Sequence, residues 1–153
     1  MAEQSVKETP ETQGNQQTKE QNQQSNQKTV KLIIKRQDNN ESKPYEETFE
    51  IPYKENLNVI ACLMEIRRNP VNAKGEKTTP VTWDMNCLEE VCGACSMVIN
   101  GRARQSCSAI VDQLEQPIRL EPMSTFPVIR DLQVDRSRTV SYTHLTLPTN
   151  REV

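Results

Sequence analysis

Aromatic and other large apolar residues are scarce in this chain of 153 residues. Only 4% of the residues are aromatic and 34% are hydrophobic, which is low for a chain that folds along its whole length. We therefore expect part of the chain not to pack. The length suits a single folded domain.

Long apolar runs and an excess of positive charge are also missing. The first 28 residues hold no apolar run, so no signal peptide is expected, and no stretch reaches the length of a membrane span. The formal net charge is −2, whereas nucleic acid normally meets a basic patch. We expect no nucleic-acid binding, no direct membrane insertion and a reducing cytoplasmic setting. In such a setting clustered cysteines are more often metal ligands or redox groups than disulfides.

The two ends of the chain differ from its middle. Residues 1–28 are expected to form a disordered Gln-rich tail, because residues 13–27 are mostly Gln, Asn, Thr, Lys and Glu without a periodic apolar residue. Residues 139–153 read TVSYTHLTLPTNREV, a string without amphipathic pattern that resembles a translated sequencing adapter. We expect this segment to be non-native, and its lone His144 is not a plausible metal ligand. Residues 29–138 remain as the folded domain.

The first half of this domain predicts two strands and a helix. Alternating apolar residues over 30–35 and 45–51 predict an antiparallel strand pair joined by a polar turn. Asn58 is expected to cap a helix that ends before Pro70. Cys62 lies on the apolar face of that helix, where a free cysteine packs as a small hydrophobe.

The second half predicts a hairpin and a further strand. Residues 96–99 and 102–109 are expected to be strands joined by Asn100-Gly101, a pair that tolerates the positive φ of a tight turn. Another strand is expected at residues 117–120. Together these elements predict a small α+β domain with a mixed sheet.

Four of the five cysteines lie in a spacing with known chemistry. Residues 86–107 read NCLEEVCGACSMVINGRARQSC, a C-x4-C-x2-C run followed by a fourth cysteine beyond the predicted hairpin. This is the spacing of a plant-type [2Fe–2S] site, in which two irons bridged by two sulfides need four outward thiolates. A short loop supplies three of these thiolates and the hairpin returns the fourth. The candidate iron ligands are Cys87, Cys92, Cys95 and Cys107.

Other states of the same cysteines stay open from the residues alone. Structural zinc also uses four cysteines, usually as two C-x2-4-C pairs, but only one such pair is present. Two disulfides fit the count but not the compartment. A thioredoxin-like site needs a βαβ context, whereas Cys95 precedes a predicted strand. The function classes that follow are a one-electron carrier and a zinc-stabilised interaction domain.

Residues beside the candidate ligands suggest how the site is tuned. Gly93 and Ala94 are small, so backbone N–H groups can approach the sulfurs and stabilise negative charge there. Glu89 and Glu90 are expected to lower the reduction potential, because an electron arriving near two carboxylates is disfavoured. Trp83 is assigned to the core or to an interface.

Residues 29–138 resemble the N-terminal part of the iron–sulfur subunits of succinate dehydrogenase and fumarate reductase, in their Gram-positive bacterial form. The resemblance rests on three segments, VKLIIKRQD, NPVNAKGEKTTPVTWDMNCLEEVCGACSMVINGRARQSC and QPIRLEPMSTFPVIRDLQVDRSR. It implies a β-grasp, ferredoxin-like fold. It also implies that Cys87 and Cys92 bind one iron and that Cys95 and Cys107 bind the other. Some relatives have Asp at the third ligand position, where this chain has Cys95.

The resemblance implies an electron relay with no catalytic residue in this chain. In such complexes the [2Fe–2S] cluster takes electrons from the FAD of a flavoprotein subunit. A [4Fe–4S] and a [3Fe–4S] cluster then pass them towards a quinone at a cytochrome b membrane anchor. The subunit is thus expected to be peripheral on the inner face of the cytoplasmic membrane.

The chain departs from this pattern in one respect. The other two clusters are held by C-x2-C-x2-C-x3-C-P runs, which the chain lacks, so it is expected to be truncated and inactive alone. A stand-alone ferredoxin-like carrier is the alternative. Such carriers usually have a strongly acidic surface, and a net charge of −2 argues against that.

Overall fold

A computed structural model describes residues 28–137, so the predicted tails, with His144, lie almost entirely outside the described residues. The elements in chain order are β1 (Thr29–Arg36), β2 (Tyr45–Pro52), α1 (Val59–Arg68), β3 (Ser96–Ile99), β4 (Arg102–Gln105), a 3-10 turn (Val111–Gln113), β5 (Ile118–Glu121), β6 (Val128–Arg130) and β7 (Gln133–Val134). Among residues 28–137, no helix is long and apolar enough to cross a membrane.

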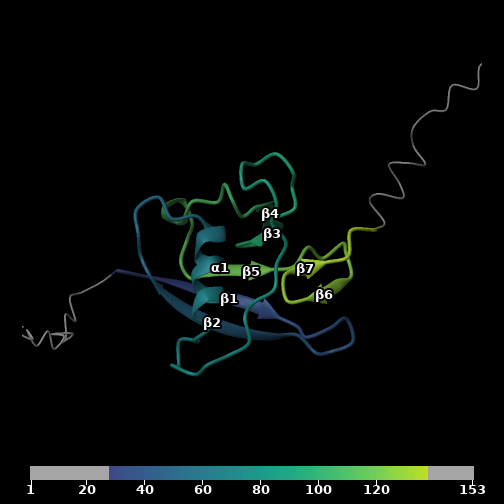
Figure 1. Cartoon of the computed structure of the whole chain (residues 1–153), viewed down its shortest axis with the longest axis horizontal. Helices are drawn as coiled ribbons and strands as arrows, with labels where there is room; N and C mark the ends of the chain where they lie inside the picture. Colours follow the sequence, from purple (N-terminus) through teal and green to yellow (C-terminus); the bar gives the residue numbers. More distant parts are fainter. Residues whose placement is uncertain (1–27, 138–153) are drawn as a thin grey trace, which may run out of the picture.

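Five strands form one mixed sheet in the order β2-β1-β5-β3-β4. Strands β1 and β2 are antiparallel, with Thr29 opposite Pro52 and Arg36 opposite Tyr45. Strand β1 runs parallel to β5, and β3 is antiparallel to both β4 and β5. Helix α1 lies across one face of this sheet, and the β6–β7 pair lies beside it (Figure 1). The arrangement confirms the predicted α+β fold of the β-grasp type.

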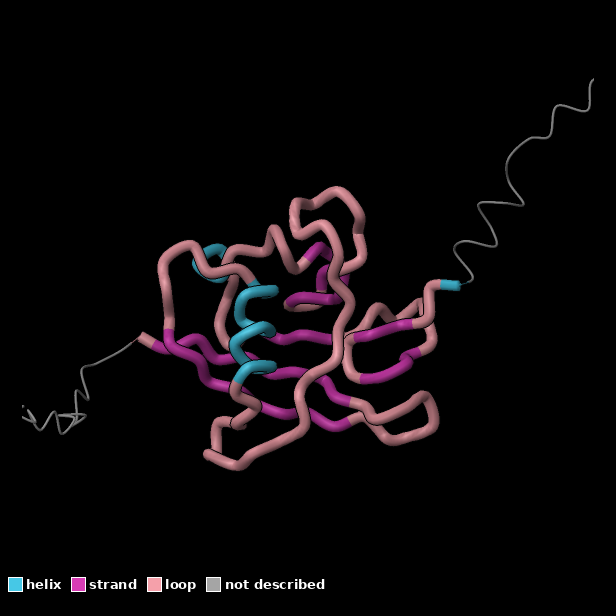
Figure 2. The backbone as a smooth tube through the Cα atoms, in the orientation of Figure 1, coloured by secondary structure: helices cyan, strands magenta, loops and turns pink. Residues whose placement is uncertain are grey.

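Helix α1 lies over the strands of the sheet (Figure 2). It begins after its predicted cap, Asn58, and buries one face. The Asn58 side chain accepts a hydrogen bond from the Ala61 N–H at 2.9 Å, and the helix ends at Arg68, before Pro70. Its buried residues recur at helical spacing and are Val59, Ile60, Cys62, Leu63 and Ile66. Burial of each large apolar side chain contributes about 1.5–3 kcal/mol to folding.

Strand β1 carries a charged residue on its inward face. Val30, Leu32 and Ile34 are fully buried, and the next inward position is Arg36, also at 0% exposure. The Arg36 Nε and Nη2 donate to the two carboxylate oxygens of Asp131 at 3.0 and 3.1 Å. Because Asp131 lies between β6 and β7, this buried pair fastens the small β6–β7 pair to the main sheet.

Two details differ from the sequence-based expectation. Strand β4 ends at Gln105 instead of reaching residue 109, because the chain turns at residues 106–108 and the Ser108 hydroxyl donates to the Gln105 carbonyl at 3.2 Å. The β6–β7 pair was not predicted, since strands of three and two residues are too short to show an alternating pattern.

Candidate iron–sulfur site

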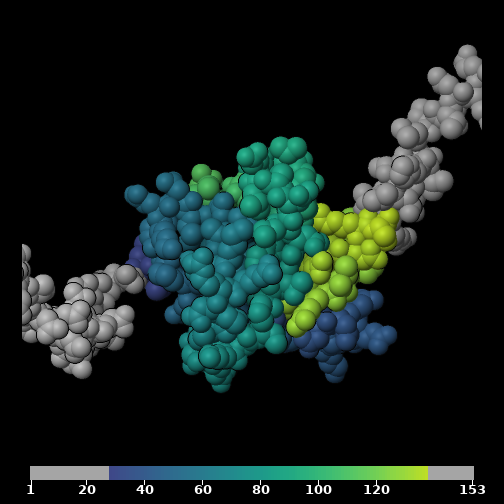
Figure 3. Space-filling model, viewed as in Figure 1, coloured from purple at the N-terminus to yellow at the C-terminus, as the bar shows by residue number. Residues whose placement is uncertain are grey.

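The four candidate cysteines come from a loop and a turn at one end of the sheet. Cys87 and Cys92 lie in the irregular segment that precedes β3, which protrudes from the body of the domain (Figures 1 and 3). Cys95 directly precedes β3, and Cys107 lies in the turn after β4. Cys92 is exposed and Cys87 half-buried, whereas Cys95 and Cys107 are only 3% and 7% exposed. The site therefore has an outer and an inner pair of thiols.

Backbone N–H groups surround the outer pair. The Cys87 N–H donates to the Cys92 sulfur at 3.4 Å, and the Cys92 N–H donates to the Cys87 sulfur at 3.3 Å. The Glu89 N–H donates to the Cys87 sulfur and the Ala94 N–H to the Cys92 sulfur, both at 3.4 Å. Donors of this kind stabilise negative charge on sulfur. The predicted backbone approach at Ala94 is confirmed.

The loop reaches this geometry through left-handed backbone conformations. Leu88 and Glu90 both have φ of 61°, and Gly93 has φ of 70°. A non-glycine residue in this region costs roughly 1–3 kcal/mol, so the loop stores strain in order to turn its N–H groups inwards. A Cβ added at Gly93 would meet nothing closer than the Ser96 Oγ at 3.8 Å. Gly93 therefore suits this position through its positive φ, and its predicted role in the approach of backbone N–H groups to the sulfurs stays a prediction.

The inner pair is fixed by the hairpin and by the helix cap. The Ser106 hydroxyl donates to the Cys95 carbonyl at 3.0 Å, which holds the turn after β4 beside the start of β3. The Asn58 side-chain amide donates to the Cys107 carbonyl at 2.9 Å while its oxygen caps α1. The Cys107 thiol interacts with Cys95 and also feels the charge of Cys87, so the inner pair lies within electrostatic range of the outer one.

The ionisation of the thiols follows their surroundings. Hydrogen bonds from the N–H groups of Glu89 and Cys92 lower the pKa of Cys87 to about 7. Burial opposes ionisation of Cys95, but hydrogen bonds from Cys107 and Ser106 together bring its pKa below the usual value. Burial is the main cause that raises the pKa of Cys107, and the hydrogen bond between its side chain and that of Cys95 raises it further.

The donor set fits a two-iron cluster. Each iron of such a cluster needs two thiolates besides its two sulfides, and the site offers two facing pairs. A structural zinc ion instead needs four ligands at one point. The outer and inner pairs, which lie on a loop and on a turn, match the first arrangement better than the second.

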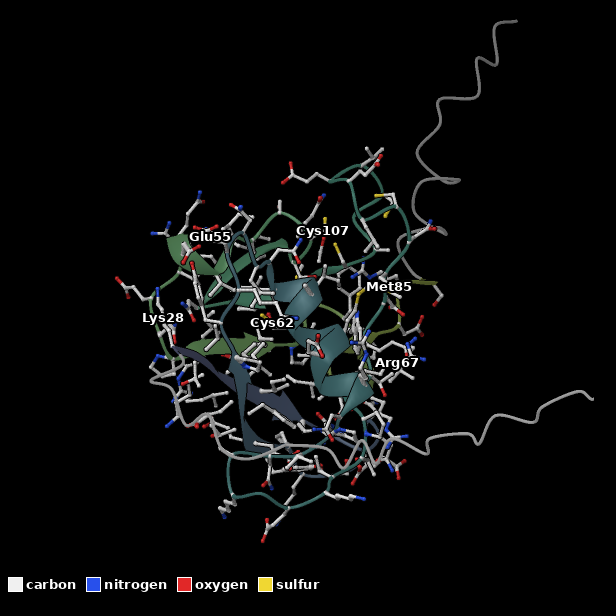
Figure 4. The ribbon with its side chains drawn as sticks, turned by 60° about the vertical axis from the view of Figure 1, so that its left-hand side comes forward. Lys28, Glu55, Cys62, Arg67, Met85 and Cys107 are labelled. Atoms are coloured by element: carbon white, nitrogen blue, oxygen red, sulfur yellow. The ribbon has the colours of Figure 1, made fainter. Side chains whose placement is uncertain are left out.

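The remaining predicted residues fall where expected. Cys62 is fully buried on the inner face of α1 and lies apart from Cys107 (Figure 4), and burial raises the pKa of its thiol to about 12. Trp83 is 9% exposed, with the Arg67 guanidinium 5.8 Å from its ring centroid. Glu89 and Glu90 are exposed on the loop, and their effect on the reduction potential stays a prediction.

Sequence reasoning missed two contacts that shape the site. One is the second hydrogen bond of Asn58, to the Cys107 carbonyl. The other is Arg136, whose Nη1 donates to the Gly93 carbonyl at 2.8 Å and whose Nη2 donates to the Ser96 carbonyl at 3.1 Å. Neither contact has a local sequence signal, because the partners lie 49 and at least 40 residues apart in the chain.

Known proteins are similar to this chain in sequence and in fold. The sequence model for the family described as 2Fe-2S iron-sulfur cluster binding domain matches residues 31–141. The succinate dehydrogenase iron-sulfur subunit of Bacillus subtilis is 79% identical over 114 residues, which cover 74% of this chain and 45% of that protein. The fumarate reductase iron-sulfur subunit of Mycobacterium tuberculosis is 36% identical over 98 residues, covering 63% and 37%.

A solved structure agrees with these matches. A chain of the Mycobacterium smegmatis Sdh1 complex in the apo form superposes with a TM-score of 0.62 at 26% identity, covering 77% of this chain and 46% of that one. The present chain thus spans less than half the length of each of these relatives. The resemblance to succinate dehydrogenase and fumarate reductase iron–sulfur subunits is confirmed, and the chain belongs to the family of 2Fe-2S iron-sulfur cluster binding domains.

Proposed function

We propose that Cys87, Cys92, Cys95 and Cys107 hold the [2Fe–2S] cluster and that this domain carries one electron at a time within a succinate dehydrogenase. The observation that carries the proposal is that two thiol pairs lie within electrostatic range of each other, with four backbone N–H···S bonds on the outer pair. The cluster supplies the one-electron redox chemistry. The pairing supports Cys87 with Cys92 on one iron and Cys95 with Cys107 on the other.

The chain's own residues give the two pairs different tasks. The buried Cys95 and Cys107 anchor the site to β3 and to the turn after β4, so their sulfurs have fixed positions. The outer pair lies on a protruding loop where Cys92 is exposed and Val91 has 81% of its surface free. A redox partner that docks on this loop would approach the outer pair most closely.

The electron donor in this proposal is the FAD of a flavoprotein subunit. The support is the 79% identity to a succinate dehydrogenase iron-sulfur subunit and the structural match to a chain of an Sdh1 complex. The [4Fe–4S] and [3Fe–4S] clusters and the contact with a cytochrome b membrane anchor would belong to the part of the relatives that this chain does not span. Its location would then be the inner face of the cytoplasmic membrane, as a peripheral subunit.

Replacement of each candidate ligand by serine tests the site. Cys87→Ser, Cys92→Ser, Cys95→Ser and Cys107→Ser are each expected to lower iron and acid-labile sulfide content. Cys62→Ala is the matched control, because Cys62 lies on the buried face of α1, apart from Cys107. Full cluster loading in any of the four serine variants, with an unchanged spectrum, would remove that cysteine from the ligand set.

Reduction by succinate tests the partner. The cluster-loaded chain is mixed anaerobically with the flavoprotein subunit of a Bacillus succinate dehydrogenase, and the reduced cluster is followed by EPR. Succinate is expected to reduce it only when the flavoprotein is present. A cluster that dithionite reduces readily but that succinate and flavoprotein never reduce would instead favour the stand-alone carrier.

A further inference from the structure

Arg136 holds the backbone of the cysteine loop from a distant part of the chain. It follows β7, and its two terminal nitrogens donate to the Gly93 carbonyl at 2.8 Å and to the Ser96 carbonyl at 3.1 Å. These carbonyls flank Ala94 and Cys95, and each belongs to a residue adjacent to a proposed ligand. The guanidinium therefore lies against the segment that joins the outer thiol pair to the inner one.

The positive charge of Arg136 lacks a nearby carboxylate. Its Nε is buried without a hydrogen-bond partner, and within residues 28–137 no Asp or Glu oxygen lies within 4.0 Å of its nitrogens. Arg36 shows the contrast, since its guanidinium meets the carboxylates of Asp131 and Glu47 at 3.0 and 2.7 Å. The charge of Arg136 is thus available to stabilise negative charge at the site.

We propose that Arg136 raises the reduction potential of the [2Fe–2S] site by placing this uncompensated positive charge against the ligand loop. The inference rests on the proposed cluster ligands. Reduction adds one electron and one negative charge to the site, supplied by a reduced flavin or, in the assay, by dithionite, and no bond forms or breaks. A fixed cation nearby favours that added charge. Arg136 is a positioning residue whose effect opposes the predicted effect of Glu89 and Glu90.

The size of the effect follows from Coulomb's law. For unit charges roughly 10 Å apart in a medium of effective dielectric about 20, loss of the cation changes the ratio of reduced to oxidised protein at a fixed potential by on the order of tenfold. A tenfold change corresponds to about 59 mV for a one-electron couple. A shift of this size is well resolved in a redox titration.

Three variants separate charge from anchoring. Arg136→Gln removes the charge but keeps a donor, Arg136→Lys keeps the charge but loses the two-pronged contact, and Arg68→Gln removes an equal charge from an exposed site paired with Glu65 at 3.6 Å. The readout is the midpoint potential from an EPR-monitored redox titration of the full chain. Iron, sulfide and thermal unfolding are measured alongside to confirm that each variant is loaded and folded.

We expect a lower midpoint potential in Arg136→Gln and values near wild type in Arg136→Lys and Arg68→Gln. An unchanged potential in Arg136→Gln would overturn the inference, as would equal lowering in the Gln and Lys variants. Where Arg136→Gln does not retain the cluster, Arg136→Met is titrated in its place, because it also removes the charge, with a lowered potential in support and an unchanged one against. A wild-type chain without a [2Fe–2S] cluster would instead mean that the proposed function itself has failed.

Discussion

Asp131→Asn is expected to destabilise the domain strongly, because Asp131 is the buried partner of a buried arginine. Both side chains have 0% exposure. One oxygen of Asp131 accepts from the Arg36 Nε and from the Gln37 N–H, and the other accepts from the Arg36 Nη2 and the Thr82 N–H, at distances of 3.0–3.3 Å. Whichever oxygen becomes an amide NH2 group, one buried guanidinium N–H and one part-buried backbone N–H lose their acceptor.

The expected loss in the free energy of unfolding is about 3 kcal/mol. Removal of one partner from a buried ion pair typically costs about 3–5 kcal/mol, because the other charge stays buried and unpaired. The lower end applies here, since the Glu47 carboxylate remains 2.7 Å from the Arg36 Nη1. For a domain of this size the loss corresponds to a fall in Tm on the order of 10 °C.

Chemical unfolding of the full chain, followed by far-UV circular dichroism, measures this loss with both proteins in the same cluster state. Glu46→Gln is the matched control, because it removes a carboxylate from an ion pair with Arg119 whose side chains are 57% and 52% exposed. The control is expected to change stability by about 0.5 kcal/mol or less. Equal stability of Asp131→Asn and the control would refute the view that the buried pair fastens β6 and β7 to the sheet.

Four further outcomes are expected. In the metal-free protein, alkylation of Cys87 rises as pH increases through about 7, because its thiol becomes a thiolate there. Cys62, with a pKa of about 12, stays unmodified at pH 8, and mass spectrometry of alkylated peptides checks both outcomes. Cys62→Ser destabilises folding by about 1–3 kcal/mol through a buried hydroxyl without lowering iron content, measured by urea unfolding and metal analysis. Asn58→Ala costs about 0.5–2 kcal/mol from the lost cap and loosens the Cys107 turn, which faster hydrogen exchange there would show. The double change Glu89→Gln and Glu90→Gln raises the midpoint potential, and a redox titration with no upward shift would contradict that hypothesis.

Local patterns in the sequence predicted most of the elements that build the site. The alternation in β1 and β2, the Asn58 cap and the Asn100-Gly101 turn each depend on residues close together in the chain, so periodicity and turn chemistry suffice. The cysteine spacing likewise singled out four thiols as candidate iron ligands, and that role stays a prediction. The structure places these four in the loop before β3 and in the turn after β4, and leaves Cys62 in the core.

Long-range contacts of charged residues could not be predicted in this way. Arg36 occupies an inward position of β1 because Asp131 pairs with it there. Asp131 lies 95 residues further along the chain, so no local pattern predicts the pair. Arg136 reaches the Gly93 carbonyl across 43 residues. The left-handed φ of Leu88 and Glu90 also opposes their intrinsic preference, and only the closed loop with its N–H···S bonds accounts for it.

EPR spectroscopy of the anaerobically purified chain, before and after dithionite, tests the central claim most directly when combined with iron and acid-labile sulfide analysis. The account predicts a paramagnetic signal that appears only on reduction, with about two irons and about two sulfides per chain. A colourless protein that holds zinc and no sulfide would contradict the account, and the electron-relay function would be lost with it.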